Sequence, residues 1–406
     1  METQHHVSSK LWTKNFIIIV IGNLFVYMGF QMLIPTLPVY VKDIGGTDMQ
    51  AGLVVSLFAF SALIFRSITG KAVDSWGRAP LLFIGFIVLI LSNLSLFVFS
   101  TVVMLLSIRA IQGIGWGMTS TTIATIMSDN VPDKKRGEGT GYYALSVILA
   151  TSLAPIVGIA MQNKLGFNAI LIFTSIVMVV GLLLMNMIRI PKRARTAMPA
   201  SEKQPILKQL FEKQALLPSI LCFLLAVPFG GIMSFIALFG REIGINQIWV
   251  YFIGHCAMIV ITRPFIGKLF DKRGHASVIL PGAISMAIGL ITLSFTTSIA
   301  TLVIASLFFG FGFGAVQPSL QAWALNRSPS HRKGAANGTF LSFMDLGVSL
   351  GIVILTPIIS MTSYALMYRY SALFMIAFLI IYSIYLMRSK RYKAAVEKTE
   401  PSEQIV

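Results

Sequence analysis

Long apolar runs separated by short polar segments make up most of the chain. Each run reaches about 20 residues or more, the length that a helix needs to cross a hydrocarbon core of roughly 30 Å. The stretch from Leu81 to Leu91 does not alternate apolar and polar positions, which argues against the strands of a membrane β-barrel. The pattern predicts an all-α integral membrane protein with twelve transmembrane helices, at residues 16–41, 51–70, 80–100, 102–127, 138–162, 168–190, 216–239, 246–268, 277–296, 299–324, 335–360 and 363–387.

The second half of the chain repeats polar and small residues of the first half, mostly at a constant displacement of 197 residues. The glycine pattern Gly113-x-Gly-x-Gly117 returns as Gly310-x-Gly-x-Gly314. Lys42-Asp43-Ile-Gly45 is echoed by Arg241-Glu242-Ile-Gly244, at a displacement of 199. One loop segment also returns, with Arg66, Gly70, Lys71, Asp74 and Gly77 matched by Arg263, Gly267, Lys268, Asp271 and Gly274.

This duplication divides the chain into two comparable halves. Six predicted spans precede the polar stretch 191–215 and six follow it. A duplicated unit in a membrane protein points to a pathway between the two halves. We therefore expect an N-terminal six-helix bundle over 1–190, a cytoplasmic linker over 191–215, and a C-terminal six-helix bundle with a cytoplasmic tail over 216–406.

Composition and charge agree with a membrane location. Hydrophobic residues make up 56% of the chain and charged residues 12%, whereas soluble domains carry about 25% charged residues. The net charge of +17 is unevenly distributed, because 25 of the 32 Lys and Arg residues fall on the side of the two termini and 3 on the other side. The positive-inside rule places both termini in the cytoplasm. The basic balance thus reflects topology and contact with anionic membrane lipid, not nucleic-acid binding.

Other classes of function find little support in the sequence. Met1–Lys10 lacks the features of a cleavable signal peptide, so the first span is expected to act as the targeting signal. Cys222 and Cys256 lie inside predicted spans, where a free thiol behaves as a small hydrophobe. Motifs for zinc proteases, serine hydrolases and phosphate-binding loops are missing, so we expect no enzyme, metal or cofactor. The glycines from Gly113 to Gly117 predict close helix packing.

Three ionisable residues inside predicted spans are candidates for coupling, because such groups cost roughly 2.5–3.5 kcal/mol on insertion scales. Asp345 is an acid deep in the eleventh span and a candidate proton carrier; the alternative is a carboxylate held between the two halves by packing at Gly347 and Gly351. Arg109 could tune a proton site or contact substrate, or make a structural bond between helices. His255 could titrate near neutral pH, or could bond a backbone carbonyl.

Further charges lie near the ends of predicted spans. Arg66 and Arg263 are each about one turn from the cytoplasmic surface, and we expect both to extend toward the lipid headgroups. Glu138 lies in the first turn of the fifth span, where its negative charge is expected to stabilise the N-terminus of the helix.

Three segments resemble a known family. The loop after the second span reads Gly70-Lys-Ala-Val-Asp74-Ser-Trp-Gly77-Arg78, the fourth span contains Arg109-Ala-Ile-Gln112-Gly113-Ile-Gly115, and the first span ends in Ile34-Pro35-Thr-Leu37-Pro38. These segments resemble the major facilitator superfamily and, within it, the twelve-span drug/proton antiporters. The resemblance extends from about residue 16 to 387. It implies two pseudo-symmetric six-helix bundles and proton-coupled efflux of a small amphipathic compound by a monomer in a bacterial plasma membrane.

A fifth-span pattern that marks the antiporters is present with substitutions. Its positions are occupied by Gly141, Ala150, Ala154, Pro155 and Gly158. Two glycines of the family pattern have become alanine, and the final glycine has become isoleucine. Alanine still permits close helix approach, so we expect the packing role to be retained.

The resemblance also implies a gate at the cytoplasmic face. Asp74 would meet the positive end of the eleventh helix, and Arg78 would pair with Asp129, holding an outward-facing state. The alternative is a loop whose charges are solvated and serve topology only. The proposed gate comprises Gly70, Asp74, Gly77, Arg78 and Asp129, with the repeated Gly267, Asp271 and Gly274.

The resemblance further implies that the first, fourth, seventh and tenth spans line a substrate cavity. Aromatic and amide side chains there suit a mid-sized amphipathic compound, cationic if Asp345 faces the cavity. The alternatives are an importer or facilitator of a sugar or organic acid, and a polytopic membrane enzyme or receptor. The candidate cavity residues are Asn23, Tyr27, Phe30, Gln31, Gln112, Trp116, Phe229, Ser234, Phe235, Gln317, Gln321 and Trp323.

Overall fold

The computed structural model describes residues 11–98, 101–132, 135–188, 212–329 and 332–399. Twelve helices of these residues are long and apolar enough to cross a membrane, as the sequence predicts. The predicted ends at 99–100 and 189–190 lie outside the described residues. The elements are α1 (Lys14–Gln31), α2 (Leu33–Asp43), α3 (Asp48–Ser75), α4 (Arg78–Val98), α5 (Val102–Asn130), α6 (Arg136–Leu165), α7 (Phe167–Asn186), η2 (Lys213–Ala215), α9 (Leu216–Glu242), α10 (Val250–Arg273), α11 (Ala276–Ser294), α12 (Ile299–Arg327), α13 (Lys333–Met361) and α14 (Tyr364–Thr399).

The first span consists of two helices, α1 and α2, which meet at Met32. Pro35 has no backbone N–H, so the carbonyl of Gln31 receives no regular helical hydrogen bond from it. Met32 keeps right-handed helical dihedral angles, with φ −63° and ψ −32°, so the span bends without reversing its direction.

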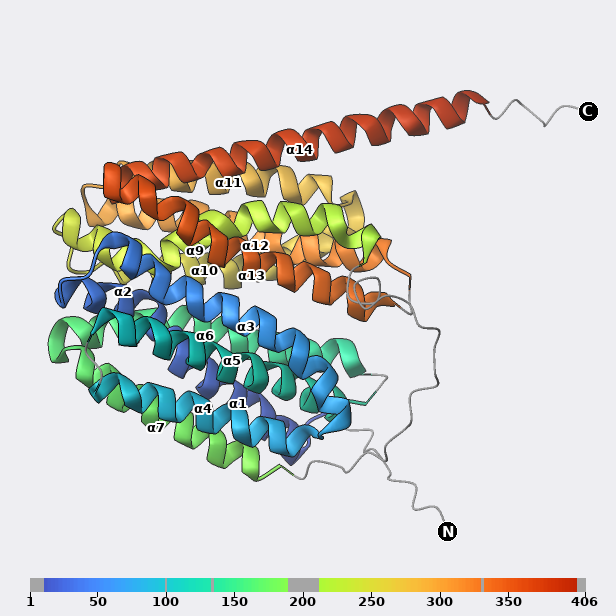
Figure 1. Cartoon of the computed structure of the whole chain (residues 1–406). Coiled ribbons are helices and arrows are strands. Elements are labelled where there is room, and N and C mark those ends of the chain that lie inside the picture. Colours follow the sequence, from blue (N-terminus) through green and yellow to red (C-terminus); the bar gives the residue numbers. More distant parts are fainter. Residues whose placement is uncertain (1–10, 99–100, 133–134, 189–211, 330–331, 400–406) are drawn as a thin grey trace, which may run out of the picture.

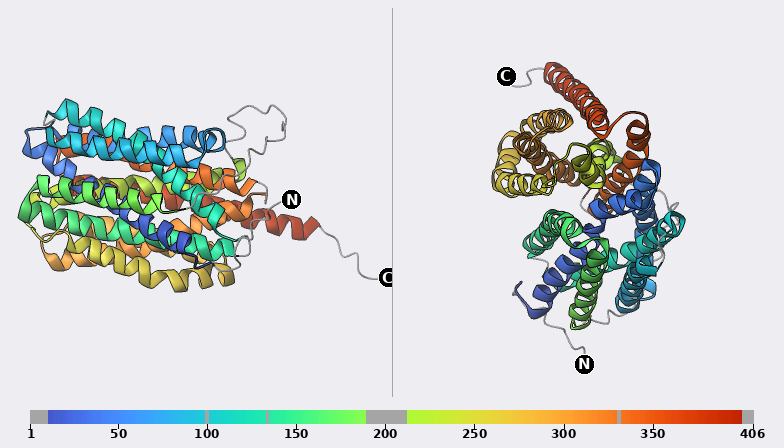
Figure 2. Two further views of the ribbon diagram at one scale, coloured as in Figure 1. Left: turned by 90° about the horizontal axis from the view of Figure 1, so that it is seen from below. Right: turned by 90° about the vertical axis from the view of Figure 1, so that its left-hand side faces the viewer.

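The helices form two groups that lie side by side. Helices α1–α7, coloured blue to green, form one group, and helices α9–α14, coloured yellow-green to red, form the other (Figure 1). The end-on view shows the two groups meeting along a central seam (Figure 2, right). We call them the N-half and the C-half.

The duplication is visible in the helix boundaries. Helix α12 starts and ends 197 residues after α5, and α13 starts 197 residues after α6. The same displacement relates Gly77 and Gly274, which have φ values of +90° and +75° and end α3 and α10. This left-handed conformation favours glycine, so both loops keep the residue that their tight turn requires.

Close helix crossings also repeat between the halves. A Cβ atom on Gly113 would lie 2.3 Å from the carbonyl oxygen of Phe58, and one on Gly310 would lie 2.7 Å from that of His255. Positions 58 and 255 are again 197 residues apart. The glycine packing predicted for the fourth span is therefore present in both halves, between α3 and α5 and between α10 and α12.

The two ends of the bundle can be told apart by the helix ends that lie there. The start of α1, the end of α3 and the start of α13 lie at one end, which we call the termini face. The start of α3, the end of α9 and the start of α14 lie at the other end, which we call the distal face.

Candidate functional site

An ion pair joins the two halves inside the bundle. The Arg66 guanidinium on α3 donates to the carboxylate of Asp345 on α13. Both residues lie 16 to 18 residues from the distal ends of their helices, or about 25 Å at 1.5 Å per residue. The side chains are 29% and 31% exposed, so the pair borders accessible space. The expectation that Arg66 extends to the headgroups is wrong, because the facing carboxylate holds it; its repeat counterpart Arg263 is exposed.

Other helices of both halves contribute to the surroundings of this pair. Tyr27 on α1 lies within electrostatic range of both charges, and Tyr143 on α6 lies within range of Arg66. Cys222 on α9 is a similar neighbour of Asp345. Side chains from α1, α6 and α9 therefore interact electrostatically with the charges of the pair.

Glycine packing fixes the backbone around Asp345, but within the C-half and not between the halves as the alternative for this residue expects. A Cβ on Gly347 would lie 2.6 Å from the Phe223 carbonyl oxygen, and one on Gly351 would lie 2.7 Å from the Val227 Cα. These contacts attach α13 to α9 within the C-half. The Asp345 carboxylate itself contacts the N-half.

Arg109 lies apart from Asp345, fully buried within the N-half. Its Nε donates to the Val54 carbonyl oxygen at 3.0 Å, and its Nη1 donates to Gln112 Oε1 at 2.5 Å. Its Cζ lies 4.2 Å from the centre of the Phe58 ring. Within the described chain no carboxylate pairs with Arg109, so the structural bond between helices α3 and α5 is present and a role in coupling stays a prediction.

His255 is buried in the C-half, 4% exposed, among aromatic rings. The centres of the rings of Phe229, Tyr251, Phe309 and Phe313 lie 5.7 to 6.3 Å from its own. In the described part of the chain its Nδ1 has no hydrogen-bond partner. The three predicted coupling residues are thus not brought together, since Arg109 and His255 lie in different halves and Asp345 lies at their seam.

Four of the candidate cavity residues belong to matched aromatic clusters. In the N-half, the Phe30 ring stacks on the Phe58 ring, with 5.0 Å between the ring centres, and its centre lies 4.1 Å from that of the Trp116 ring. In the C-half, Phe229 stacks on Phe313 at 4.4 Å. The members of the two clusters occupy equivalent positions of the repeat. Phe30 corresponds to Phe229, Phe58 to His255 and Trp116 to Phe313. Tyr27 packs edge-on against Trp116 at 4.7 Å.

The amide candidates bond to neighbouring helices of their own half. Asn23 donates to Ser146 Oγ at 2.9 Å, and Gln31 donates to Thr151 Oγ1 at 2.9 Å, so both link α1 to α6. Gln321 donates to Asn337 Oδ1 at 2.8 Å and links α12 to α13.

The remaining cavity candidates lie in different places. Gln317 is half-buried on α12, and Ser234 is fully buried on α9. Phe235 packs near the distal face, against Tyr364. Trp323 does not lie with the other candidates, because it stacks on His275 and contacts Tyr382 and Tyr385 of α14, within the C-half.

Most residues of the fifth-span pattern lie on the buried face of α6. Ala150, Ala154, Pro155 and Gly158 are buried. A Cβ on Gly158 would lie 3.1 Å from the carbonyl oxygen of Met32, at the junction of α1 and α2. The small residues therefore permit close approach of α6 to the first span.

At the termini face the Arg78 guanidinium pairs with the Asp129 carboxylate, linking α4 to α5. This contact is the one that the family resemblance implies for these residues. The side chain of Asp74 lies outside the described side chains, and Asp271 is exposed. The gating role of these residues stays a prediction.

Several pairs of helices contact each other across the seam, among them α3 with α13, α2 with α9 and α6 with α10. Near the distal face, a Cβ on Gly52 of α3 would lie 2.5 Å from Thr356 Oγ1 of α13. Toward the termini face, a Cβ on any of the repeat-related glycines Gly70, Gly141, Gly267 and Gly338 would meet no atom within 4 Å. The halves are therefore tightly packed distally and have free space beside these helices at the termini face.

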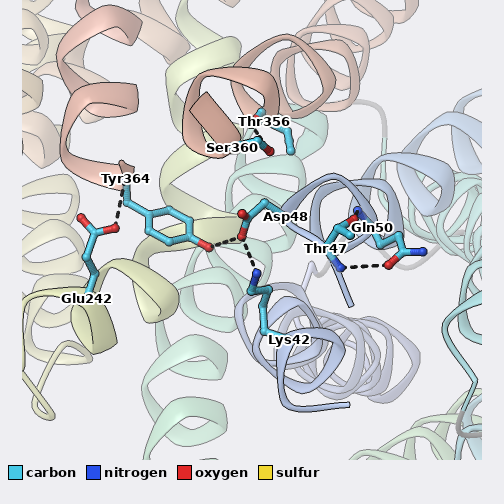
Figure 3. A network of polar contacts seen from close by, with 8 residues as sticks. All are labelled: Lys42, Thr47, Asp48, Gln50, Glu242, Thr356, Ser360 and Tyr364. Atoms are coloured by element: carbon cyan, nitrogen blue, oxygen red, sulfur yellow. Dashed lines mark hydrogen bonds and ion pairs between the residues drawn. The ribbon is translucent and has the colours of Figure 1, made fainter. Parts of the chain in front are cut away.

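A polar network joins the halves at the distal face (Figure 3). The Tyr364 hydroxyl donates to Asp48 Oδ1 at 3.0 Å, and Asp48 also pairs with Lys42 at 2.9 Å. The Tyr364 backbone N–H donates to Glu242 Oε2 at 3.2 Å. Thr47 caps α3 and so positions Asp48 in the first helical turn. Tyr364 thereby ties α14 of the C-half to α3 of the N-half.

A second distal contact lies between the first and seventh spans. Arg241 of α9 forms a two-pronged ion pair with Asp43 of α2, with Nη2 3.1 Å from Oδ2. Beside this ion pair, a further bond joins the halves: Asn163 Nδ2 of α6 donates to the carbonyl oxygen of Asn246, between α9 and α10, at 3.2 Å. The sequence singled out these charged segments as a repeat but did not show that they pair.

This architecture defines a polytopic membrane transporter whose two halves meet at a charged seam. A family model described as Major Facilitator Superfamily matches residues 19–352, and the chain belongs to this family. Among curated relatives it is 25% identical to a multi-drug resistance efflux pump PmrA homolog of Lactococcus lactis, covering 84% of this chain and 86% of the relative. It is 24% identical to the quinolone resistance protein NorA of Staphylococcus aureus, and the match covers 81% of this chain and 86% of the relative.

The solved structures support the same fold. The crystal structure of a mutant of the nucleoside transporter NupG matches with a TM-score of 0.76 at 13% identity, covering 91% of this chain and 99% of that one. At this identity the likeness concerns the fold, twelve helices in two pseudo-symmetric bundles.

Proposed function

We propose that this protein exports a small amphipathic organic compound across the plasma membrane in exchange for protons. The observation that carries the proposal is the ion pair between Arg66 and Asp345, which joins the halves and is partly accessible. The multi-drug efflux pump and the quinolone resistance protein among the curated relatives support the outward direction and the class of substrate. Both termini would lie in the cytoplasm, as the distribution of Lys and Arg indicates.

The pair offers a direct link between protonation and movement. A proton on the Asp345 carboxylate removes its negative charge, and the attraction to Arg66 across the seam is lost with it. The halves, 1–190 and 216–406, would then be free to rock about the seam. In the proposed cycle, the Arg241–Asp43 and Tyr364–Asp48 contacts would close the outer face, which is the arrangement of an inward-facing state.

The proposed substrate path runs between the two aromatic clusters. Tyr27 and Trp116 in the N-half and Phe229 in the C-half offer apolar surfaces, and the Asp345 carboxylate favours a cationic group. At the cytoplasmic face, Asp74 would stabilise the opposite, outward-facing state, and the Arg78–Asp129 pair, which is formed within the N-half, would position the loop that carries Asp74.

The test uses Asp345→Asn, which resembles the protonated acid but cannot release a proton. In inverted vesicles, an acidified lumen should drive accumulation of a fluorescent cationic dye by the wild type and not by the variant. Dye binding and downhill exchange should remain measurable. Arg263→Gln, at an exposed charge of the repeat, serves as the control. Normal proton-driven accumulation by Asp345→Asn would refute the assignment, and loss of dye from the vesicles on acidification would indicate uptake instead.

A further inference from the structure

Five buried polar atoms in the C-half have no hydrogen-bond partner within the described chain; two are Ser234 Oγ on α9 and Ser319 Oγ on α12, and the other three lie on α10 and α14. These three are the hydroxyls of Tyr251 on α10 and Tyr368 on α14, and Nδ1 of His255 on α10. Their side chains are 0%, 0% and 4% exposed. A buried polar group without a partner costs about 1–3 kcal/mol, so three in one region need a physical reason.

These groups follow one another from the distal network inward. Tyr364 and Tyr368 are one helical turn apart on α14, and Tyr368 lies within electrostatic range of Tyr251 and Glu242. Tyr251 and His255 are one turn apart on α10, with nearly parallel rings 6.2 Å apart. The series therefore begins at the carboxylates bonded to Tyr364, which Figure 3 shows, and ends at the His255 imidazole.

The fold does not require polar groups at these positions, as the repeat shows. The N-half residues 197 positions earlier are Val54 for Tyr251, Phe58 for His255, Phe167 for Tyr364 and Leu171 for Tyr368. All four are apolar, and helices α3, α5 and α7 pack with them. Since apolar side chains fill the same places in the same fold, the polar series serves something other than packing.

Water is the partner that such groups ordinarily find. Buried waters typically make about three hydrogen bonds to polar groups that have no other partner. A water between two hydroxyls completes both bonds and forms a continuous hydrogen-bonded chain. Along such a chain each oxygen accepts one proton and passes another on, so its own charge state is unchanged.

We propose that water-bridged Tyr364, Tyr368 and Tyr251 conduct protons from the distal carboxylates Asp48 and Glu242 to Nδ1 of His255. The inference rests on the proposed proton coupling and adds a second proton-binding site, in the C-half. The path admits protons while the distal contacts keep the substrate pathway closed.

Among the described residues, few charged or titratable side chains lie next to this path. The side chains that face His255 from α9 and α12 are Phe229, Phe309 and Phe313, which do not titrate. Tyr251 is its titratable neighbour on α10. At the distal end, Lys42 is the cation that pairs with Asp48.

The test removes single hydroxyls and keeps the rings. Tyr251→Phe and Tyr368→Phe should each slow proton-driven dye transport roughly tenfold, because each breaks the chain at one bond. Dye exchange without a proton gradient should be unchanged. Tyr370→Phe, at an exposed tyrosine of α14, is the matched control and should match the wild type. His255→Phe, which installs the residue of the N-half, should be as slow as the tyrosine variants.

Thermal melting of the purified variants supplies a readout that does not depend on transport. If waters bond the hydroxyls, Tyr251→Phe and Tyr368→Phe should melt below the wild type; if the hydroxyls are unbonded, these changes should leave melting unchanged or raise it. Unchanged transport in both variants, or a raised melting temperature, would overturn the path. A wild type without proton-driven transport would instead refute the proposed function.

Discussion

At the scale of single residues, the contact between Arg66 and Asp345 can be tested as a pair. Two groups that act through one contact lose their function when either is removed, and removing both adds little. We expect Arg66→Gln and Asp345→Asn each to abolish uphill transport in vesicles. The double variant should fold and exchange dye at least as well as Arg66→Gln, because that single change leaves a carboxylate unpaired at the seam.

The repeat supplies a control for this residue pair. Arg263 occupies the position equivalent to Arg66 in the C-half, but its side chain is exposed. Arg263→Gln should therefore retain nearly wild-type uphill transport. Dye exchange that falls further in the double variant than in either single variant would show that the two residues act independently.

At the scale of the elements, the repeated glycines set how closely helices cross. An alanine at position 113 would place its Cβ 2.1 Å from Ser61 Oγ and 2.3 Å from the Phe58 carbonyl oxygen. Because backbone cannot move aside cheaply, Gly113→Ala should destabilise the protein by about 1–3 kcal/mol and lower its melting temperature. Gly310→Ala should act in the same direction, since it would meet the backbone of His255.

The matched control is Gly338→Ala on α13. A Cβ there meets no atom within 4 Å, and alanine is favoured over glycine in a helix by about 0.5–1 kcal/mol. Its melting temperature should equal or exceed that of the wild type. Equal melting of Gly113→Ala and Gly338→Ala would show that close crossing of α3 and α5 contributes nothing to stability.

At the scale of the whole molecule, the distal contact between Asp43 and Arg241 can report which face is closed. Cysteines replacing these two residues, with Cys222 and Cys256 changed to alanine, should be joined by a short bifunctional thiol reagent. Joining them should stop transport, because the outer face could no longer open. Asp74→Asn should increase the yield of joined protein, since it weakens the proposed outward-facing state; Asp271→Asn should change it less. An unchanged yield together with unchanged transport would contradict the gating role of Asp74.

The coupling site shows the limit of prediction from sequence. Asp345 was recognised because a lone acid deep in an apolar span is costly and needs a reason. Its partner was missed, because Arg66 near a span end fits an ordinary contact with headgroups equally well. The Tyr364–Asp48 bond was also missed, because neither residue has an unusual position in the sequence, although the charged segments at the ends of the first and seventh spans were noticed as a repeat.

The twelve spans, the duplication and the close glycine crossings can all be predicted from the order of the residues alone. These follow from local rules, since the thickness of the bilayer fixes the length of each apolar run and a missing side chain permits close approach. The tertiary structure decided which charges meet. Arg66 and Asp345 are 279 residues apart, and Tyr364 and Asp48 are 316 apart. Their contact depends on how two separate bundles are placed against each other, and no local pattern of residues specifies that placement.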